Sequence, residues 1–289
     1  MSSLIAAHFD HRRVYDDFTY VYPVISRRSG GLSIGINLNP DRKCNFDCIY
    51  CEVDRSLPVL RRDIDLSLLE EELRHMLQLY RTGSLFAHEP FARVPPKWRG
   101  LKDIAFSGDG EPTTYPLFQE AVDVVWRVRD EARLANTKMI LITDAACLNR
   151  PAVRRGLRQM QEGEHEIWAK LDAGTQGYFQ MVNRSRIPLR QILKNIADTA
   201  GWCPLIIQTL FMKVSGIVPS EDEIRAYADR LNEIRTQGGK ILGLQLHTIA
   251  RPVAFNEATA LADQQLDHIA ALVKELTGLP QRVFYGNAP

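Results

Sequence analysis

A repeating order of apolar runs and amphipathic segments constrains the fold of this 289-residue chain more than any other feature. A strand-like stretch at residues 32–38 is followed by helical spacing over residues 63–81, and the same order returns five times from residue 102 onward. Apolar runs of strand length separated by helices are typical of parallel strands joined by right-handed crossovers. The sequence therefore predicts an α/β fold with six βα units.

The later units can be placed along the chain from their apolar patterns. Their strands are expected at residues 103–108, 138–144, 166–174, 204–211 and 241–249. Their helices are expected at residues 115–132, 150–160, 190–200, 220–238 and 262–278, with a loop between residues 174 and 190. Six units are too few for an eight-stranded barrel, which leaves a partial barrel or an open doubly wound sheet.

No low-complexity linker or shift in composition divides the chain, so we expect a single domain over residues 1–289. Residues 1–30 are expected to form an N-terminal arm with a short strand, residues 31–278 the partial barrel, and residues 279–289 a C-terminal tail. No apolar run reaches the length of a membrane-spanning helix. We therefore expect a protein with no membrane partner.

Three of the five cysteines fall within one short stretch, where Cys44, Cys48 and Cys51 have the spacing CxxxCxxC. Three thiolates can hold three irons of a 4Fe-4S cluster and leave the fourth iron open to another ligand, whereas such clusters normally take four cysteines. Pro40 and Asp41 precede the cysteines and favour a loop at the end of a strand.

Other interpretations of these cysteines stay open on the residues alone. The same spacing would place them on one stripe of a helix as ordinary buried residues. A zinc site would need a fourth ligand nearby, and disulfide pairing would leave one thiol over. Few cysteines gathered in one motif point to a reducing compartment, and the cytoplasm is the expected location.

Polar residues follow the apolar runs, at the strand ends where parallel α/β folds bind ligands. In the turn after the second predicted strand, Gly108 and Gly110 allow close backbone approach and Glu111 offers an acceptor for a cationic amine. The later strand ends supply further candidates, which are Thr143, Asp144, Lys170, Asp172, Gln208 and Thr248. Helix caps or ion pairs at the rim are equally compatible with several of these.

The cysteine motif, followed one βα unit later by the GDGEP turn, resembles the radical S-adenosylmethionine superfamily. The later segments KLDAG, IIQTLF and HTIARP are similar to the branch that contains the wyosine-type tRNA base synthases. The resemblance covers Leu32 to roughly residue 254. It implies a partial (β/α)6 barrel instead of the doubly wound sheet.

The resemblance also implies a function and a set of cofactor contacts. A 4Fe-4S cluster on Cys44, Cys48 and Cys51 would cleave S-adenosyl-L-methionine to methionine and a 5′-deoxyadenosyl radical, which abstracts hydrogen from an unidentified substrate. Tyr50 would contact the adenine, and the Gly108–Glu111 turn would hold the amino group of the methionine moiety. The strand-end candidates would contact the ribose and carboxylate of the cofactor. No catalytic residue is assigned.

Partners and alternatives follow from the same observations. Because no second electron carrier is recognisable in the sequence, an external donor of the flavodoxin or ferredoxin type is expected. The formal net charge of +1 gives no support for a nucleic-acid partner and does not exclude one. The alternatives are wyosine-like modification of a tRNA base, and a non-enzymatic iron–sulfur protein with a structural or sensing role.

Overall fold

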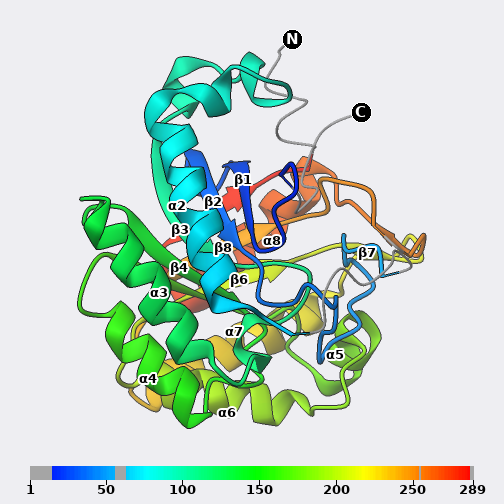
Figure 1. Ribbon diagram of the computed structural model, residues 1–289. Helices are drawn as coiled ribbons and strands as arrows, with labels where there is room; N and C mark the ends of the chain where they lie inside the picture. Colours follow the sequence, from blue (N-terminus) through cyan, green and yellow to red (C-terminus); the bar gives the residue numbers. More distant parts are fainter. Residues whose placement is uncertain (1–14, 56–62, 254, 287–289) are drawn as a thin grey trace. The chain divides into compact units, whose positions relative to one another are not determined.

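The computed structural model describes residues 15–55, 63–253 and 255–286 (Figure 1). Contacts within the chain divide the described residues into two compact units. The first comprises those within Met1–Lys43, Pro58–Ile142 and Pro151–Glu166, and the second those within Cys44–Leu57, Thr143–Arg150 and Ile167–Pro289. Two of the boundaries between the units thus fall within strands, one at the last residue of β4 (Lys138–Thr143) and one inside β5 (His165–Lys170).

Four strands belong mainly to the first unit, and they are β1 (Val21–Ser26), β2 (Gly31–Ile36), β3 (Leu101–Phe106) and β4 (Lys138–Thr143). β1 pairs antiparallel with β2, while β2, β3 and β4 pair parallel in chain order. The short strand expected in the N-terminal arm is thus β1. The parallel pairing expected from the apolar runs is confirmed for this unit.

The helices of the first unit are α2 (Leu66–Thr82), α3 (Phe118–Glu131) and α4 (Pro151–Met160). Four 3-10 turns accompany them, at Ser84–Phe86, Phe91–Arg93, Pro96–Trp98 and Pro112–Thr114. α2 lies beside α3, and α3 lies beside α4 (Figure 1). Asp65 begins α2 as expected of an N-cap residue, because its side chain accepts hydrogen bonds from the N–H groups of Ser67 and Leu68.

A buried carboxylate joins α2 to the segment before β1. The side chain of Glu72 is 5% exposed and accepts hydrogen bonds from the backbone N–H groups of Thr19, Tyr20 and Val21, at 2.7 to 3.0 Å. A buried acidic group is tolerated when its oxygens are saturated by donors in this way. Glu72 therefore fixes the position at which the chain enters its first strand.

The main strands of the second unit are β5 (His165–Lys170), β6 (Leu205–Leu210), β8 (Ile241–His247) and β10 (Gln281–Phe284). They pair parallel in the order β5-β6-β8-β10. Two short strands, β7 (Lys213–Val214) and β9 (Ala258–Thr259), pair antiparallel in a separate ribbon. β10 lies in the stretch expected to be a C-terminal tail, so the parallel sheet extends further along the chain than the sequence indicated.

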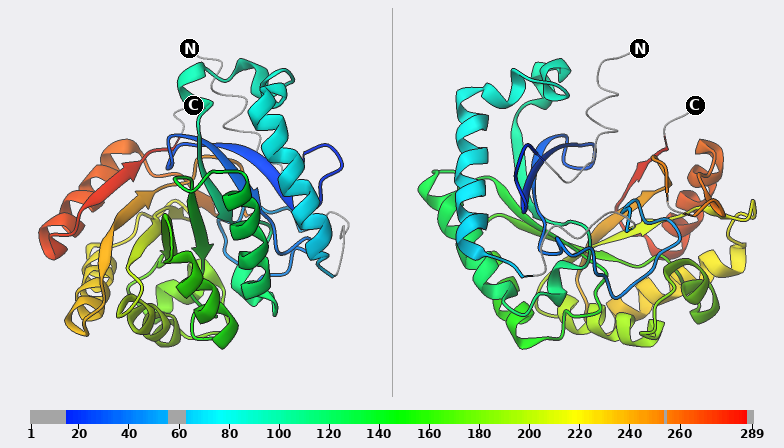
Figure 2. Two further views of the ribbon diagram at one scale, coloured as in Figure 1. Left: turned by 60° about the vertical axis from the view of Figure 1, so that its left-hand side comes forward. Right: turned by 45° about the vertical axis from the view of Figure 1, so that its right-hand side comes forward.

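The helices of the second unit are α5 (Gln176–Asn183), α6 (Leu189–Ala200), α7 (Glu221–Thr236) and α8 (Asp263–Thr277). α7 packs between α6 and α8, and α8 also contacts β10 (Figure 2). The interpretation of residues 174–190 as a loop is wrong, because they contain α5, which is capped by the Thr175 side chain. Among the described residues, no helix is both long and apolar enough to cross a membrane.

Candidate functional site

The predicted site residues fall into two groups, one in each unit, and the larger group surrounds the cysteine loop of the second unit. Cys44, Cys48 and Cys51 are free thiols of intermediate exposure, whereas Cys147 and Cys203 are buried. Residues 42–54 contain neither helix nor strand, so the expectation of a loop is confirmed over the helical alternative. The three thiols of the motif are thus the reduced cysteines that solvent or a cofactor can reach.

The end of α5 holds the cysteine loop. The N–H of Asp47 donates to the carbonyl of Asn183 at 3.1 Å, and the N–H of Ile49 donates to that of Val182 at 2.9 Å. Carbonyls in the last turn of a helix have no partner within the helix, so they are available to an incoming loop. The loop therefore occupies acceptors that the helix itself leaves unused.

Side chains reinforce this attachment beneath the cysteines. The hydroxyl of Tyr50 donates to Asp172 Oδ2, and the N–H of Leu210 donates to Asp172 Oδ1 at 2.9 Å. The Lys170 ammonium lies 5.1 Å from the centre of the Tyr50 ring, which is within cation–π range. Three residues expected to contact the cofactor, Tyr50, Lys170 and Asp172, are thus brought together beside the loop.

Partial burial has a clear electrostatic effect on the central cysteine. It raises the pKa of Cys48 to about 11, and the charge of Asp172 acts in the same direction. The Lys170 ammonium and a hydrogen bond from Asn183 lower that pKa. A cysteine in this environment keeps its proton at neutral pH unless a metal displaces it, since a metal ligand must be a thiolate.

The outer side of the loop carries a cation. The Arg55 guanidinium donates to the carbonyl of Phe46 at 3.2 Å and lies 3.9 Å from an oxygen of Asp47. Its pKa is raised by the negative charges of Cys51 and Cys44 and by a hydrogen bond to Cys51, against the lowering effect of burial. A positive charge at this place favours the thiolate forms that metal ligation requires.

In-register residues of neighbouring strands form a polar row across the second unit. Three register pairs make up this row. They are Lys170 on β5 with Gln208 on β6, Gln208 with Gln245 on β8, and Gln245 with Arg282 on β10. The Gln208 amide donates to Gln245 at 2.9 Å, and both are nearly fully buried. Parallel strands direct in-register side chains to one face of the sheet. The sequence identified Lys170 and Gln208, but it missed Arg282 because β10 was taken for a tail.

The other predicted residues of the second unit bind backbone N–H groups of nearby loops. Thr143 Oγ1 accepts from the N–H of Ala145 at 3.0 Å, and Asp144 Oδ1 accepts from the N–H of Ala146 at 2.9 Å. Thr248 Oγ1 accepts from the N–H of Leu261 at 2.9 Å. These backbone contacts are neither the helix caps nor the ion pairs that the sequence left open. Their part in cofactor binding stays a prediction.

The second group is the turn after β3 in the first unit. A Cβ atom on Gly108 would lie 2.3 Å from Asn37 Oδ1, and one on Gly110 would lie 2.0 Å from the carbonyl oxygen of Lys43. Asn37 Oδ1 in turn accepts from the N–H groups of Asn39 and of Asp109. Both glycines are therefore required by close approach to the segment that leaves β2.

Glu111 is buried in the same turn, at 2% exposure. Its Oε1 accepts from the backbone N–H of Thr113 at 3.0 Å and from the hydroxyl of the same residue. This carboxylate begins the 3-10 turn Pro112–Thr114 as its N-cap. The acceptor role expected of Glu111 toward a cationic amine stays a prediction.

The donor set of the cysteine loop fits an iron–sulfur cluster. Three free thiols lie within eight residues of chain, with N–H donors from Asn183 and Arg55 directed at two of the sulfurs. Within the part of the chain that the structure describes, no three His, Cys, Asp or Glu side chains are gathered closely enough to hold one metal ion. A four-iron cluster is larger than a single ion and spreads its thiolates over a wider span.

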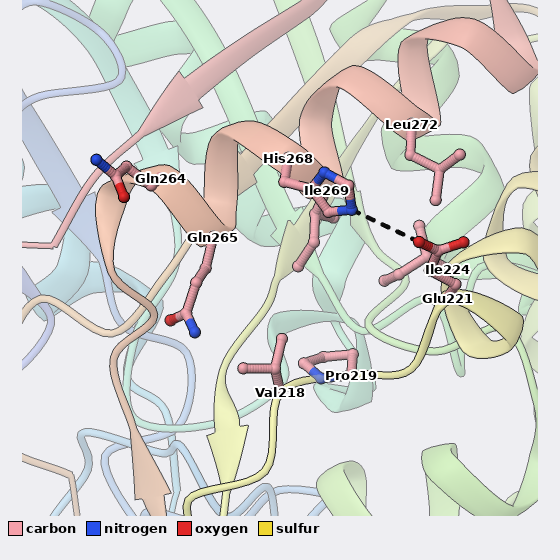
Figure 3. Close-up of a pocket in the computed structure, with 9 residues that line it drawn as sticks. All are labelled: Val218, Pro219, Glu221, Ile224, Gln264, Gln265, His268, Ile269 and Leu272. Carbon is pink, nitrogen blue, oxygen red and sulfur yellow. Dashed lines mark ion pairs between the residues drawn. The ribbon is translucent and has the colours of Figure 1, made fainter.

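A separate hollow of about 220 Å³ lies between the start of α7 and α8 (Figure 3). Its walls are mainly apolar, with Val218, Ile224 and Ile269 among them, and His268 Nε2 lies 3.8 Å from Glu221 Oε1 at its edge. None of the residues predicted to bind a cofactor lines it. The hollow is therefore not part of the candidate site.

No family model matches the chain. A UPF0026 protein of Helicobacter pylori strain J99 is 25% identical over 267 residues, which are 90% of this chain and 75% of the relative. A structure of TYW1 with a lysine-pyruvate adduct bound matches with a TM-score of 0.55 and 14% identity, over 93% of this chain and 80% of that one. Streptococcus suis SuiB bound to S-adenosylmethionine matches with a TM-score of 0.57 and 13% identity, over 90% of this chain and 51% of that one.

The two structural matches extend over at least nine-tenths of the chain. At identities of 13% and 14%, these matches show a shared fold alone. They confirm the fold class predicted from the sequence, that of the partial (β/α)6 barrel.

Proposed function

We propose that this chain, which has the fold of the radical S-adenosylmethionine superfamily, is an enzyme that holds a 4Fe-4S cluster and binds S-adenosylmethionine. One observation carries the proposal: three reduced, accessible cysteines lie on one loop that a helix end and a buried network hold in place. When bound and reduced, the cluster supplies the electron that splits the cofactor into methionine and a 5′-deoxyadenosyl radical, which abstracts hydrogen from the substrate.

The residues of the chain have defined tasks in this proposal. Cys44, Cys48 and Cys51 ligate three irons as thiolates, and the Arg55 guanidinium offsets part of their negative charge. The buried positions of Tyr50 and Asp172 support a task in holding the loop that carries these ligands. Fixed ligand geometry of this kind is what a metal site needs from its surroundings.

The cofactor itself is assigned to the strand-end residues. We assign its amino group to Glu111 and the turn that Gly108 and Gly110 permit, and its carboxylate to Lys170. Contacts with the remaining polar parts of the cofactor are assigned to Thr143, Asp144, Gln208 and Thr248. Adenine contact by the aromatic ring of Tyr50 is part of the same proposal.

The proposal is tested by anaerobic reconstitution with iron and sulfide, followed by incubation with S-adenosylmethionine and dithionite. We expect about four irons per chain and release of 5′-deoxyadenosine. Cys48→Ala is expected to abolish both, whereas Cys203→Ala removes a buried thiol outside the loop and should retain both. Zinc in place of iron, or cofactor cleavage by the Cys48→Ala variant, would refute the assignment.

The same experiment separates the alternatives. A stable cluster without any cofactor cleavage would favour a structural or sensing protein that is not an enzyme. Wyosine-like modification of a tRNA base is compatible with the similarity to TYW1 and forms the second candidate. Strongly salt-dependent binding of tRNA would favour it, since phosphate contacts release counterions. An external one-electron donor of the flavodoxin or ferredoxin type remains part of the proposal.

A further inference from the structure

Asn183, the last residue of α5, is buried at 1% exposure beside the central cysteine of the loop. Its side-chain nitrogen lies 3.4 Å from Cys48 Sγ, 3.3 Å from the Tyr50 hydroxyl and 3.0 Å from Asp172 Oδ2. No feature of the sequence singled this residue out. One amide group thus meets a predicted metal ligand and the two side chains that support the loop.

The chemistry of the neighbours determines which end of the amide faces them. An ionised carboxylate only accepts hydrogen bonds, so the atom of Asn183 next to Asp172 must be the NH2 nitrogen. That group has two hydrogens. If Asp172 accepts one, the other is available to the sulfur of Cys48.

The backbone of the same residue fixes the distance between amide and sulfur. The carbonyl of Asn183 accepts from the N–H of Asp47, and the preceding carbonyl accepts from the N–H of Ile49. The residues on both sides of Cys48 are therefore bound to the helix end from which the amide projects. These two backbone hydrogen bonds therefore hold Cys48 at a fixed distance from the Asn183 amide.

We propose that Asn183 is a positioning residue for the cluster, which holds Cys48 in place and donates an N–H to its thiolate. The inference rests on the proposed function. A hydrogen bond to a ligating sulfur withdraws negative charge from it and stabilises the reduced, more negative cluster. Asn183 therefore raises the reduction potential of the cluster, which makes the electron easier to accept from the external donor.

The test is an EPR-monitored redox titration of the reconstituted protein and two variants. Asn183→Leu keeps a similar volume and removes the donor. We expect the reduced state to be favoured about tenfold less in this variant, which is about 59 mV for a one-electron couple. Gln180→Leu makes the same chemical change at an exposed position of the same helix and should leave the potential unchanged.

Asn183→Asp keeps the shape of the side chain and reports on the potential even if the leucine variant does not fold. The new carboxyl lies beside Asp172, so the titration is run at alkaline pH, where both groups are ionised. A second negative charge beside Cys48 should then lower the potential further than leucine does. If the clusters of the Asn183 variants have the same reduction potential as that of Gln180→Leu, the inference is overturned while the proposed function stands. Absence of any 4Fe-4S signal from the unaltered protein would instead overturn the proposed function.

Discussion

Replacing Gly110 by alanine tests whether the turn after β3 depends on close backbone approach. The added Cβ would lie 2.0 Å from the carbonyl oxygen of Lys43 and 2.8 Å from side-chain carbons of Asn39. The φ angle of Gly110 lies outside the left-handed region, so lack of space and not backbone strain opposes the substitution. The nearest atom belongs to the backbone, which cannot move aside as the end of a side chain can.

The size of the effect follows from these distances. Real Cβ atoms essentially never lie closer than 3.0 Å to such an atom. The distance between the new Cβ and the carbonyl oxygen must therefore increase from 2.0 Å by at least 1.0 Å. Overpacking of this kind costs about 1 to 3 kcal/mol, and the rigid neighbour places Gly110→Ala at about 3 kcal/mol. For a chain of 289 residues, that corresponds to a fall in Tm of roughly 5 °C.

The assay is thermal unfolding followed by circular dichroism, on proteins with the same iron content. Gly100→Ala is the matched control, because a Cβ on Gly100 would meet no atom within 4 Å and this glycine also has no left-handed φ. It should change the stability by less than about 1 kcal/mol. A Gly110→Ala protein that melts within 2 °C of the Gly100→Ala protein would refute the steric explanation of this turn.

Three further predictions concern buried polar groups and are tested by urea unfolding. Glu72→Gln replaces one of two oxygens that bind three backbone N–H groups, so it should cost about 2 to 3 kcal/mol, whereas the exposed Glu71→Gln should have almost no effect. The hydroxyls of Thr209 and Tyr227 lie 2.6 Å apart and are buried. Thr209→Val and Tyr227→Phe should each cost about 1 to 3 kcal/mol and the double variant less than their sum; additive costs would contradict this. Burial raises the pKa of Asp103, so the carboxyl group of this residue binds a proton more tightly in the folded state than in the unfolded state. The free energy of unfolding therefore falls as the pH rises through the folded-state pKa of Asp103. Asp103→Asn should therefore be more favourable at pH 7 than near pH 4, and an equal effect at both pH values would contradict the assignment.

Local patterns in the sequence predicted those parts of the site that depend on neighbouring residues. The cysteine loop and the glycine turn after β3 each follow from residue types within a few positions of one another. Asn183 could not be found in this way, because it meets Cys48 across 135 positions of chain. The stretch that contains Asn183 was also interpreted as a loop, so no helix end was expected there.

Short elements were missed for a related reason. α5 has eight residues, which give little room for a helical pattern to repeat, and β10 has four. Their places are set by tertiary contacts, since α5 supplies acceptors to the cysteine loop and β10 pairs with β8. With β10 unrecognised, Arg282 was missed although it continues the row of Lys170 and Gln208.

Several buried polar side chains of the second unit share one task, which is to bind backbone groups of the loops at the strand ends. Asp172 binds the N–H of Leu210, Glu223 binds the loop after β5, and the Asn195 amide binds two carbonyls of the loop after β4. Each side chain satisfies backbone groups that burial would otherwise penalise. The loops at the strand ends are therefore ordered by the protein itself. A cofactor that binds to them has little conformational freedom left to remove, which lowers the entropic cost of holding it.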